Sequence, residues 1–194
     1  MAAEPEGGTR DWRGIDELAG LVGAYCWVEN RIFELSGAWA SDEHGGLESA
    51  LRVWCAGVSR RHGALAARWA ERLPVRAGVD RTALVVAPAG PLAGALGAMA
   101  ATSDAEVGVG TLVQTALPRL RAVYAQHRRT ASPVSEGPVL EVLTAALQDL
   151  SAEISGGRTL LQGSPGGLQR DAALGPEVER AFVETDVFPA VLPS

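Results

Sequence analysis

The sequence contains no lysine, since all 17 of its basic residues are arginine. It therefore offers no Schiff-base lysine, no lysine-bound pyridoxal phosphate and no P-loop lysine for a nucleotide. Positive charge is not in excess either, because the formal net charge is −6. No nucleic acid and no membrane surface is expected as a partner. No apolar run approaches the roughly 20 residues that a membrane span requires.

Cysteine and aromatic residues are also scarce. Cys26 and Cys55 are the only cysteines, and both fall inside helical patterns, which favours two buried thiols in a reducing cytosol. The residues 1–10 are acidic and have no apolar segment, so we expect a flexible leader, no signal peptide and a cytoplasmic protein. The five tryptophans all precede residue 70, which places the bulkiest part of the core in the first half of the chain.

Apolar residues recur at helical spacing over most of the chain, and a hydrophobic content of 47% is enough for one sizeable core. Two long helices are predicted over 11–40 and 47–73. Pro74 should end the second, because proline cannot continue a helix. The short connection between the two helices predicts antiparallel packing.

The second half of the chain predicts another pair of long helices. A capping-box pattern at Ser103 opens the third helix, which Pro118 should bend. The fourth helix is predicted over 135–162. Between the two pairs, 75–102 is interpreted as an extended crossover that contains a short helix after Pro91.

These patterns together predict an all-α protein with an antiparallel four-helix bundle over 11–162. The segment 163–194 is predicted to hold a linker, a short helix over 176–186 and an apolar tail at 188–192 that docks on the rest of the protein.

Glu29 is the most informative polar residue. It lies at the centre of an apolar helix face, with Tyr25, Cys26, Ile32 and Phe33 three and four residues away. A carboxylate in that position should be buried, and burying an unpaired charge is costly. Glu29 therefore has a charged partner, is protonated or binds a ligand, and the structural and functional interpretations both remain open.

His62 has the same property on the second helix, where it continues the apolar line through Val58 and Leu65. A neutral, hydrogen-bonded core histidine is the alternative to a functional role. An antiparallel turn near residue 44 pairs positions whose numbers add to about 88–91, as those of Glu29 and His62 do. We therefore expect the two side chains to lie at the same level and to point inward.

Other polar residues are expected nearer the surface. His127 extends an apolar stripe but stands beside Arg128 at a helix end, which favours a capping or surface role. His44 lies in a turn. Asp149 and Glu153 are one turn apart at the edge of an apolar stripe and are expected at the boundary of the core.

Four segments support a resemblance to a known fold family: Leu117–His127, Ser135–Pro138, Leu147–Leu150 and Gly157–Gln162. With two long helix pairs and a long crossover, the chain resembles the ferritin-like superfamily over roughly residues 12–162, and in particular ferritin-like proteins of GC-rich bacteria. This resemblance implies a ferritin-like antiparallel bundle with its long crossover between the second and third helices.

Ferritin-like di-metal enzymes carry a glutamate on each of two helices and a Glu-x-x-His pair on each of the other two. Glu29 matches one of these carboxylates and His62 matches one histidine. Ser59 stands where the glutamate before His62 should be, and Leu150 and Glu153 replace the second Glu-x-x-His pair. The resemblance therefore implies a degenerate site, with no metal and no cofactor expected.

A bundle without its metal site would leave a central cavity for a small apolar or aromatic molecule. We expect Glu29 and His62 to form a metal-free catalytic acid–base pair there, in a small-molecule-binding protein or enzyme of bacterial secondary-metabolite biosynthesis that forms a homodimer. One alternative is a non-catalytic structural or dimerisation protein, and another is a di-metal oxidase with unusual ligands. The residues predicted to contact the molecule are Tyr25, Trp54, Cys55, Ser59, Tyr124 and Glu153.

Overall fold

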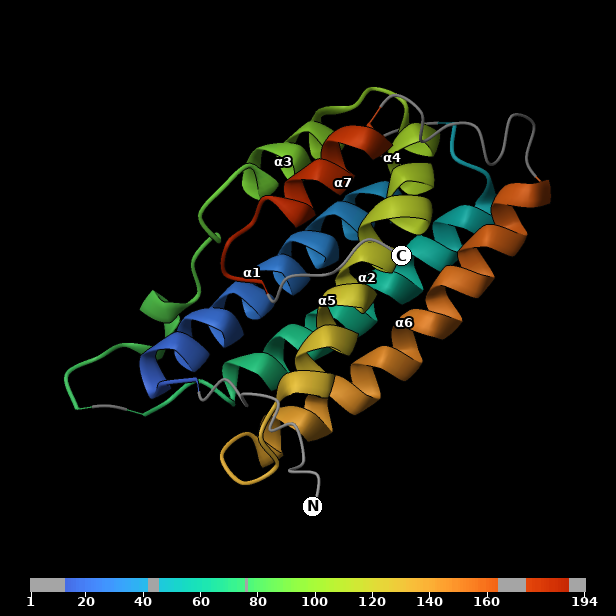
Figure 1. The fold of residues 1–194 in the computed structure, drawn as a ribbon. Coiled ribbons are helices and arrows are strands. Elements are labelled where there is room, and N and C mark those ends of the chain that lie inside the picture. Colours follow the sequence, from blue (N-terminus) through green and yellow to red (C-terminus); the bar gives the residue numbers. More distant parts are fainter. Residues whose placement is uncertain (1–12, 42–45, 76, 164–173, 189–194) are drawn as a thin grey trace, which may run out of the picture.

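The structure is a computed structural model that describes residues 13–41, 46–75, 77–163 and 174–188. Every regular element within these ranges is helical, which confirms the all-α prediction. The predicted leader at 1–10 lies outside the described residues. The long helical segments lie side by side (Figure 1), and they are α1 (Ile15–Ala40), α2 (Ser49–Ala70), a continuous segment over 105–130 and α6 (Gly137–Gly163).

The helices α1 and α2 form an antiparallel hairpin and pack against each other along most of their length. Both helices contribute completely buried apolar side chains to the core, among them Val28, Ile32 and Val58. The predicted range 47–73 is too long at both ends, since α2 begins at Ser49 and ends at Ala70. Proline disfavours a helical conformation in the residue before it, so the chain leaves the helix ahead of Pro74.

The third segment consists of α4 (Ala105–Thr111), a π-helical turn η3 (Leu112–Ala116) and α5 (Leu117–Thr130). Asp104, not Ser103, caps it, because the Asp104 carboxylate accepts hydrogen bonds from the backbone N–H groups of Glu106 at 3.0 Å and Val107 at 3.4 Å. A bend was predicted at Pro118, and the structure has a π turn immediately before this residue. Proline has no N–H to donate to a regular helical turn, and the N–H of Leu117 instead reaches back to the carbonyl of Leu112.

The helix α6 packs against both α5 and α2. It continues without interruption through Gly156 and Gly157 to Gly163. A Cβ atom on Gly157 would lie 2.6 Å from Val113 Cγ2 and 2.8 Å from Trp54 Cζ2. Glycine at this position therefore lets α6 approach both η3 and α2 closely.

The crossover contains the 3₁₀ turn η2 (Arg81–Leu84) and α3 (Leu92–Ala101), which begins after Pro91 as predicted. The helix α7 (Gly175–Val183) packs beside α3, as Figure 1 shows. The start of the predicted tail does dock, because the Phe188 ring stacks on Tyr25 with centroids 5.8 Å apart. The rest of that tail, and most of the predicted linker, lie outside the described residues.

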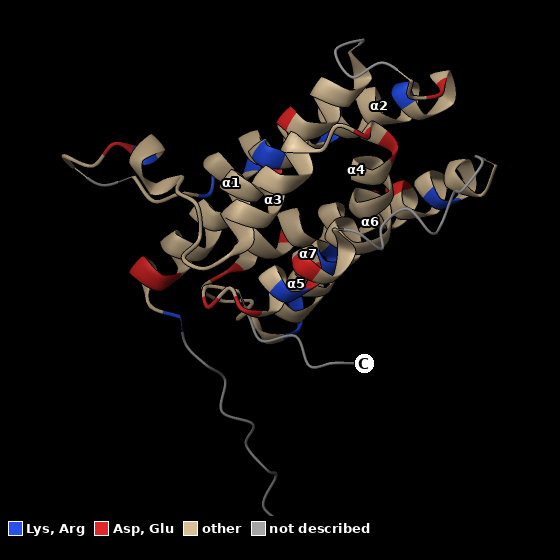
Figure 2. Ribbon diagram, turned by 90° about the horizontal axis from the view of Figure 1, so that it is seen from above, with Lys and Arg blue, Asp and Glu red and all other residues tan. Residues whose placement is uncertain are grey.

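Charged residues of both signs are distributed over the helices. Figure 2 shows acidic and basic positions scattered over the helices in this view. Within the described ranges, none of the helices combines the length and the apolar character that a membrane crossing requires.

Two glycines of α1 provide a test of how the crossover packs. A Cβ atom on Gly23 would collide with the backbone carbonyl oxygen of Leu84, whereas one on Gly20 would meet open space. We expect Gly23→Ala to lower the free energy of unfolding by about 1–3 kcal/mol, because a backbone segment must move. Gly20→Ala should raise it by about 0.5–1 kcal/mol through better helix propensity. Urea unfolding of both variants measures the difference, and equal effects would contradict the contact between α1 and η2.

Candidate functional site

Glu29 and His62 meet in the centre of the protein. Glu29 lies midway along α1 and is fully buried, and His62 lies midway along α2 with 2% of its surface exposed. The Glu29 Oε2 atom is hydrogen-bonded to His62 Nδ1. This contact confirms the prediction, made from their positions in the hairpin, that the two side chains lie at one level and point inward.

The pair belongs to a longer hydrogen-bonded chain. The Tyr124 hydroxyl donates to Glu29 Oε1 and itself accepts from the Trp69 indole N–H at 3.1 Å. On the other side of the imidazole, His62 Nε2 lies 3.1 Å from Glu153 Oε2. We call this set the core polar chain, and it runs in the order Trp69, Tyr124, Glu29, His62, Glu153 and Arg61.

Arg61 ends the chain at the protein surface. Its Nε atom donates to Glu153 Oε1, and its side chain is 38% exposed. Glu153 is buried, not at the edge of the core as the sequence pattern predicted. Glu153 lies on the side of α6 that faces α2, where it pairs with His62 and Arg61. The apolar pattern of α6 alone does not show that α2 offers these charged partners.

The two carboxylates hold a proton on His62. Burial lowers the pKa of the imidazole, but the charge of Glu29 and the hydrogen bonds to Glu153 and Glu29 outweigh it and raise the pKa to about 10. Burial raises the pKa of Glu153, and the hydrogen bond and charge of His62, with those of Arg61, lower it overall. At neutral pH both ring nitrogens of His62 therefore donate, and two positive groups face two carboxylates.

Tyr124 stays protonated in this setting. Burial raises the pKa of its hydroxyl well above the ordinary value, and the charge of Glu29 and the hydrogen bond to it raise the pKa further. The hydroxyl is therefore a fixed donor to Glu29, and the indole N–H of Trp69 occupies its acceptor side.

A second buried network lies beside the first. The Tyr25 hydroxyl is 3.1 Å from His127 Nδ1, and His127 Nε2 is 2.7 Å from Glu136 Oε2. The prediction of a capping or surface role for His127 is wrong, because the residue is completely buried. The apolar stripe that contains it faces inward to the end of α5, while Arg128 points to solvent.

The charge state of the second network differs from that of the first. Burial lowers the pKa of His127, the hydrogen bond to Glu136 opposes this, and the nearby charge of Arg13 lowers it again. A neutral imidazole that donates from Nε2 to Glu136 must accept at Nδ1, so the Tyr25 hydroxyl is the donor. Sequence reasoning missed Glu136, which lies in the turn before α6 and shows no apolar periodicity.

Aromatic rings separate the two networks. Tyr25 and Tyr124 form an edge-to-face pair with centroids 4.8 Å apart, and Trp69 lies 5.1 Å from Tyr25. Tyr25 thus touches the core polar chain through ring contacts, while its hydroxyl points into the second network.

The other predicted contact residues lie apart from this centre. The Trp54 ring packs on Gly157, and its buried N–H has no acceptor among the described residues. Burial raises the pKa of the Cys55 thiol to about 12. Ser59 donates to the backbone carbonyl of Phe33 at 2.9 Å. No hydrogen bond within the described residues links these three side chains to Glu29 or His62.

There is little free space next to the imidazole. A small hollow bordered by Arg61, His62 and Glu153 provides about 10 Å³ for the centre of a water molecule, which is about one water. Glu29 and Glu153 lie on opposite sides of the His62 ring and so do not converge on one point. Among the described residues, no cluster of three or more His, Cys, Asp or Glu side chains is arranged to hold a metal ion.

The chain matches no protein-family model, no curated protein and no solved structure. The ferritin-like resemblance therefore stays a prediction, and the functional argument depends on the geometry of the described residues.

The raised pKa of His62 predicts how stability depends on pH. The folded protein keeps this proton up to about pH 10, whereas an unfolded chain releases it near 6.5. The stabilisation is therefore complete below pH 6.5 and is lost as the pH rises, by up to about 1.4 kcal/mol per pH unit. Urea unfolding of the wild type and of His62→Gln between pH 6 and pH 9 measures this slope, which the substitution should flatten.

Other groups with shifted pKa values titrate only at the two ends of that window. The Cys26 and Cys55 thiols, whose pKa values burial raises, begin to contribute only near pH 9. The lowered pKa values of His127 and Glu153 act below pH 6.5. A slope that is the same in wild type and His62→Gln would show that His62 is not held protonated.

Proposed function

We propose that the protein is a metal-independent helical scaffold for binding or interaction, and that its core polar chain is a structural element. The observation that carries this proposal is that the hydrogen-bonding atoms at the centre of the core polar chain all have partners within the protein. Both carboxylate oxygens of Glu29, both of Glu153 and both ring nitrogens of His62 are bonded to other protein groups. Every polar side-chain atom of Glu29, Glu153 and His62 is therefore already engaged by another protein group, and none is left to receive a substrate.

The core polar chain ties together all four long helical segments. Glu29 belongs to α1, His62 to α2, Tyr124 to α5 and Glu153 to α6. If one segment slid by a turn, at least one buried charge would lose its partner, which costs several kcal/mol. Fully satisfied polar networks of this kind rigidify a core and specify a single packing arrangement.

Catalysis at Glu29 and His62 is the second candidate function. It is favoured by one observation, which is that the chain reaches the surface through the half-exposed Arg61. A general base works best when its pKa is close to the operating pH and a substrate can reach it. His62 already holds its proton up to about pH 10, and the hollow beside it is the size of one water. These two properties support the structural role for the pair over the catalytic one.

We also propose that the four long segments form a ferritin-like bundle. The support is the long connection between α2 and α4, together with the placement of Glu29, His62 and Glu153 at one level on three helices. In a ferritin-like frame these are positions from which a metal site would be built. Here the same positions hold a carboxylate–imidazolium–carboxylate set.

Metal content tests the metal-independent part of this proposal. A metal ion would have to displace protons that two carboxylates hold on His62, so we expect well under one equivalent of iron, manganese or zinc per chain. Elemental analysis of purified protein, before and after incubation with each metal, makes the measurement. Stoichiometric metal that Glu29→Ala removes would contradict the proposal.

Substitution of Glu29 tests the structural role directly. Glu29→Gln keeps the shape but removes the charge that faces His62, and it turns one oxygen acceptor into a donor that meets another donor. We expect the free energy of unfolding to fall by about 3 kcal/mol, measured by urea unfolding at pH 7. Glu34→Gln on the same helix is the matched control, because that side chain is 53% exposed, and it should change stability by less than about 0.5 kcal/mol.

The opposite result would favour the catalytic interpretation. If Glu29→Gln had the stability of the wild type and instead lost binding of a molecule that co-purifies with the protein, the buried charge would be serving a ligand, not the fold.

A further inference from the structure

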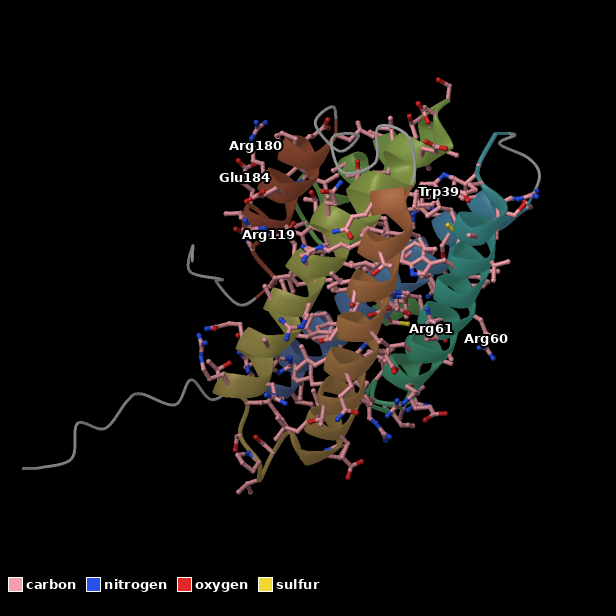
Figure 3. All side chains as sticks on the ribbon, turned by 90° about the vertical axis from the view of Figure 1, so that its right-hand side faces the viewer. Trp39, Arg60, Arg61, Arg119, Arg180 and Glu184 are labelled. Atoms are coloured by element: carbon pink, nitrogen blue, oxygen red, sulfur yellow. The ribbon has the colours of Figure 1, made fainter. Side chains whose placement is uncertain are left out.

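A pocket lies between α5 and α6, away from the core polar chain. Its volume is about 510 Å³, which lies within the range of small-molecule sites. Figure 3 shows both helices on the side that faces the viewer, with α6 in front. The residues that line it are Pro118 and Arg121 of α5, and Ser151, Ile154, Ser155, Arg158, Thr159 and Gln162 of α6.

The lining is positively charged in a protein that is acidic overall. It contains two arginines and no aspartate or glutamate, although the whole chain has 23 acidic residues against 17 basic ones. Arg121 donates from Nε to the Ser151 hydroxyl at 2.9 Å, and none of the described residues accepts from its two terminal nitrogens. Arg158 is exposed and makes no hydrogen bond or ion pair with a described residue.

The α6 wall adds a row of hydroxyl groups and an apolar floor. Ser151, Ser155 and Thr159 follow one another at intervals of four residues, so they lie on one face of the helix. The Ser151 hydroxyl donates to the carbonyl of Leu147 at 2.7 Å while it accepts from Arg121, which fixes the guanidinium in place. Ile154 and Pro118 provide the apolar contact surface.

We propose that this pocket binds a small oxyanion that carries an apolar group, such as an organic phosphate or carboxylate. Two guanidinium groups provide planar, forked donors that match the oxygens of such anions. The Ser151 and Thr159 hydroxyls already donate to backbone carbonyls of α6, so the Ser155 hydroxyl is the further donor of this row. The apolar floor accommodates the uncharged part. This site is independent of the core polar chain and goes beyond the scaffold role proposed for it.

The position of the pocket in the fold fits a binding role. Its α5 wall begins at Pro118, two residues after the π turn η3 ends. Single π turns within α-helices are frequent at functional sites, because they change the direction in which the following residues face.

Calorimetric titration of the full chain tests the proposal. Phenyl phosphate and benzoate are the anionic probes, and phenol, which has the ring without the charge, is the control ligand. We expect saturable binding of at least one of the two anions and none of phenol. Arg158→Gln and Arg121→Gln should each weaken the binding roughly tenfold, because each removes a charge-assisted hydrogen-bond donor.

Arg60→Gln is the matched control variant. Arg60 is an exposed arginine of α2 that points away from α6 in Figure 3, and its replacement should leave the affinity unchanged. Circular dichroism verifies the helical fold of all three variants. The proposal is overturned if neither anion binds saturably, if phenol binds as well as the anions, or if the Arg121 and Arg158 variants bind like Arg60→Gln.

Discussion

The constraint on which the rest of this structure depends is the burial of a protonated imidazole between two carboxylates. Glu29 and Glu153 hold the proton on His62, and each is completed by a further donor, Tyr124 in one case and Arg61 in the other. Charged groups of this kind can be buried at acceptable cost only when every one of them is paired. The partners come from all four long helical segments, so the register of those segments is fixed wherever the set is intact.

The helices could be predicted from the sequence because apolar residues recur at helical spacing. The meeting of Glu29 with His62 could be predicted because it follows from the positions of the two residues within one hairpin. The partner from α6 could not be found in this way. Periodicity shows which face of a helix is apolar, but it does not show how deep an edge residue such as Glu153 will lie once another helix packs over it. The prediction for His127 was wrong for a related reason. Its arginine neighbours in the sequence indicated an exposed position, but His127 itself lies on the buried face of α5. Its partner Glu136 lies in a turn, where no periodic signal exists.

The packing of tryptophan against glycine is a second constraint on how the helices fit together. The chain has few aromatic residues but 23 glycines, and two of its tryptophans pack directly on glycine. Trp39 of α1 covers Gly108 of α4, and Trp54 of α2 covers Gly157 of α6. Pairing the largest side chain with the smallest lets helix axes approach while the space between them stays filled. The hairpin that contains the tryptophans therefore depends on glycines from the second half of the chain.

The helix α6 shows how stability and binding can be separated in such a fold. Glu153 points into the core polar chain, whereas Ser155 and Arg158 border the pocket against α5. Ile154, between them in sequence, is 8% exposed and contributes to both the hydrophobic core and the pocket floor. Since the charges on the inner face are fully paired, Arg158 on the pocket side of α6 and Arg121 of α5 need not contribute to folding. These two arginines are therefore available to a ligand, because the scaffold that positions them is held together elsewhere.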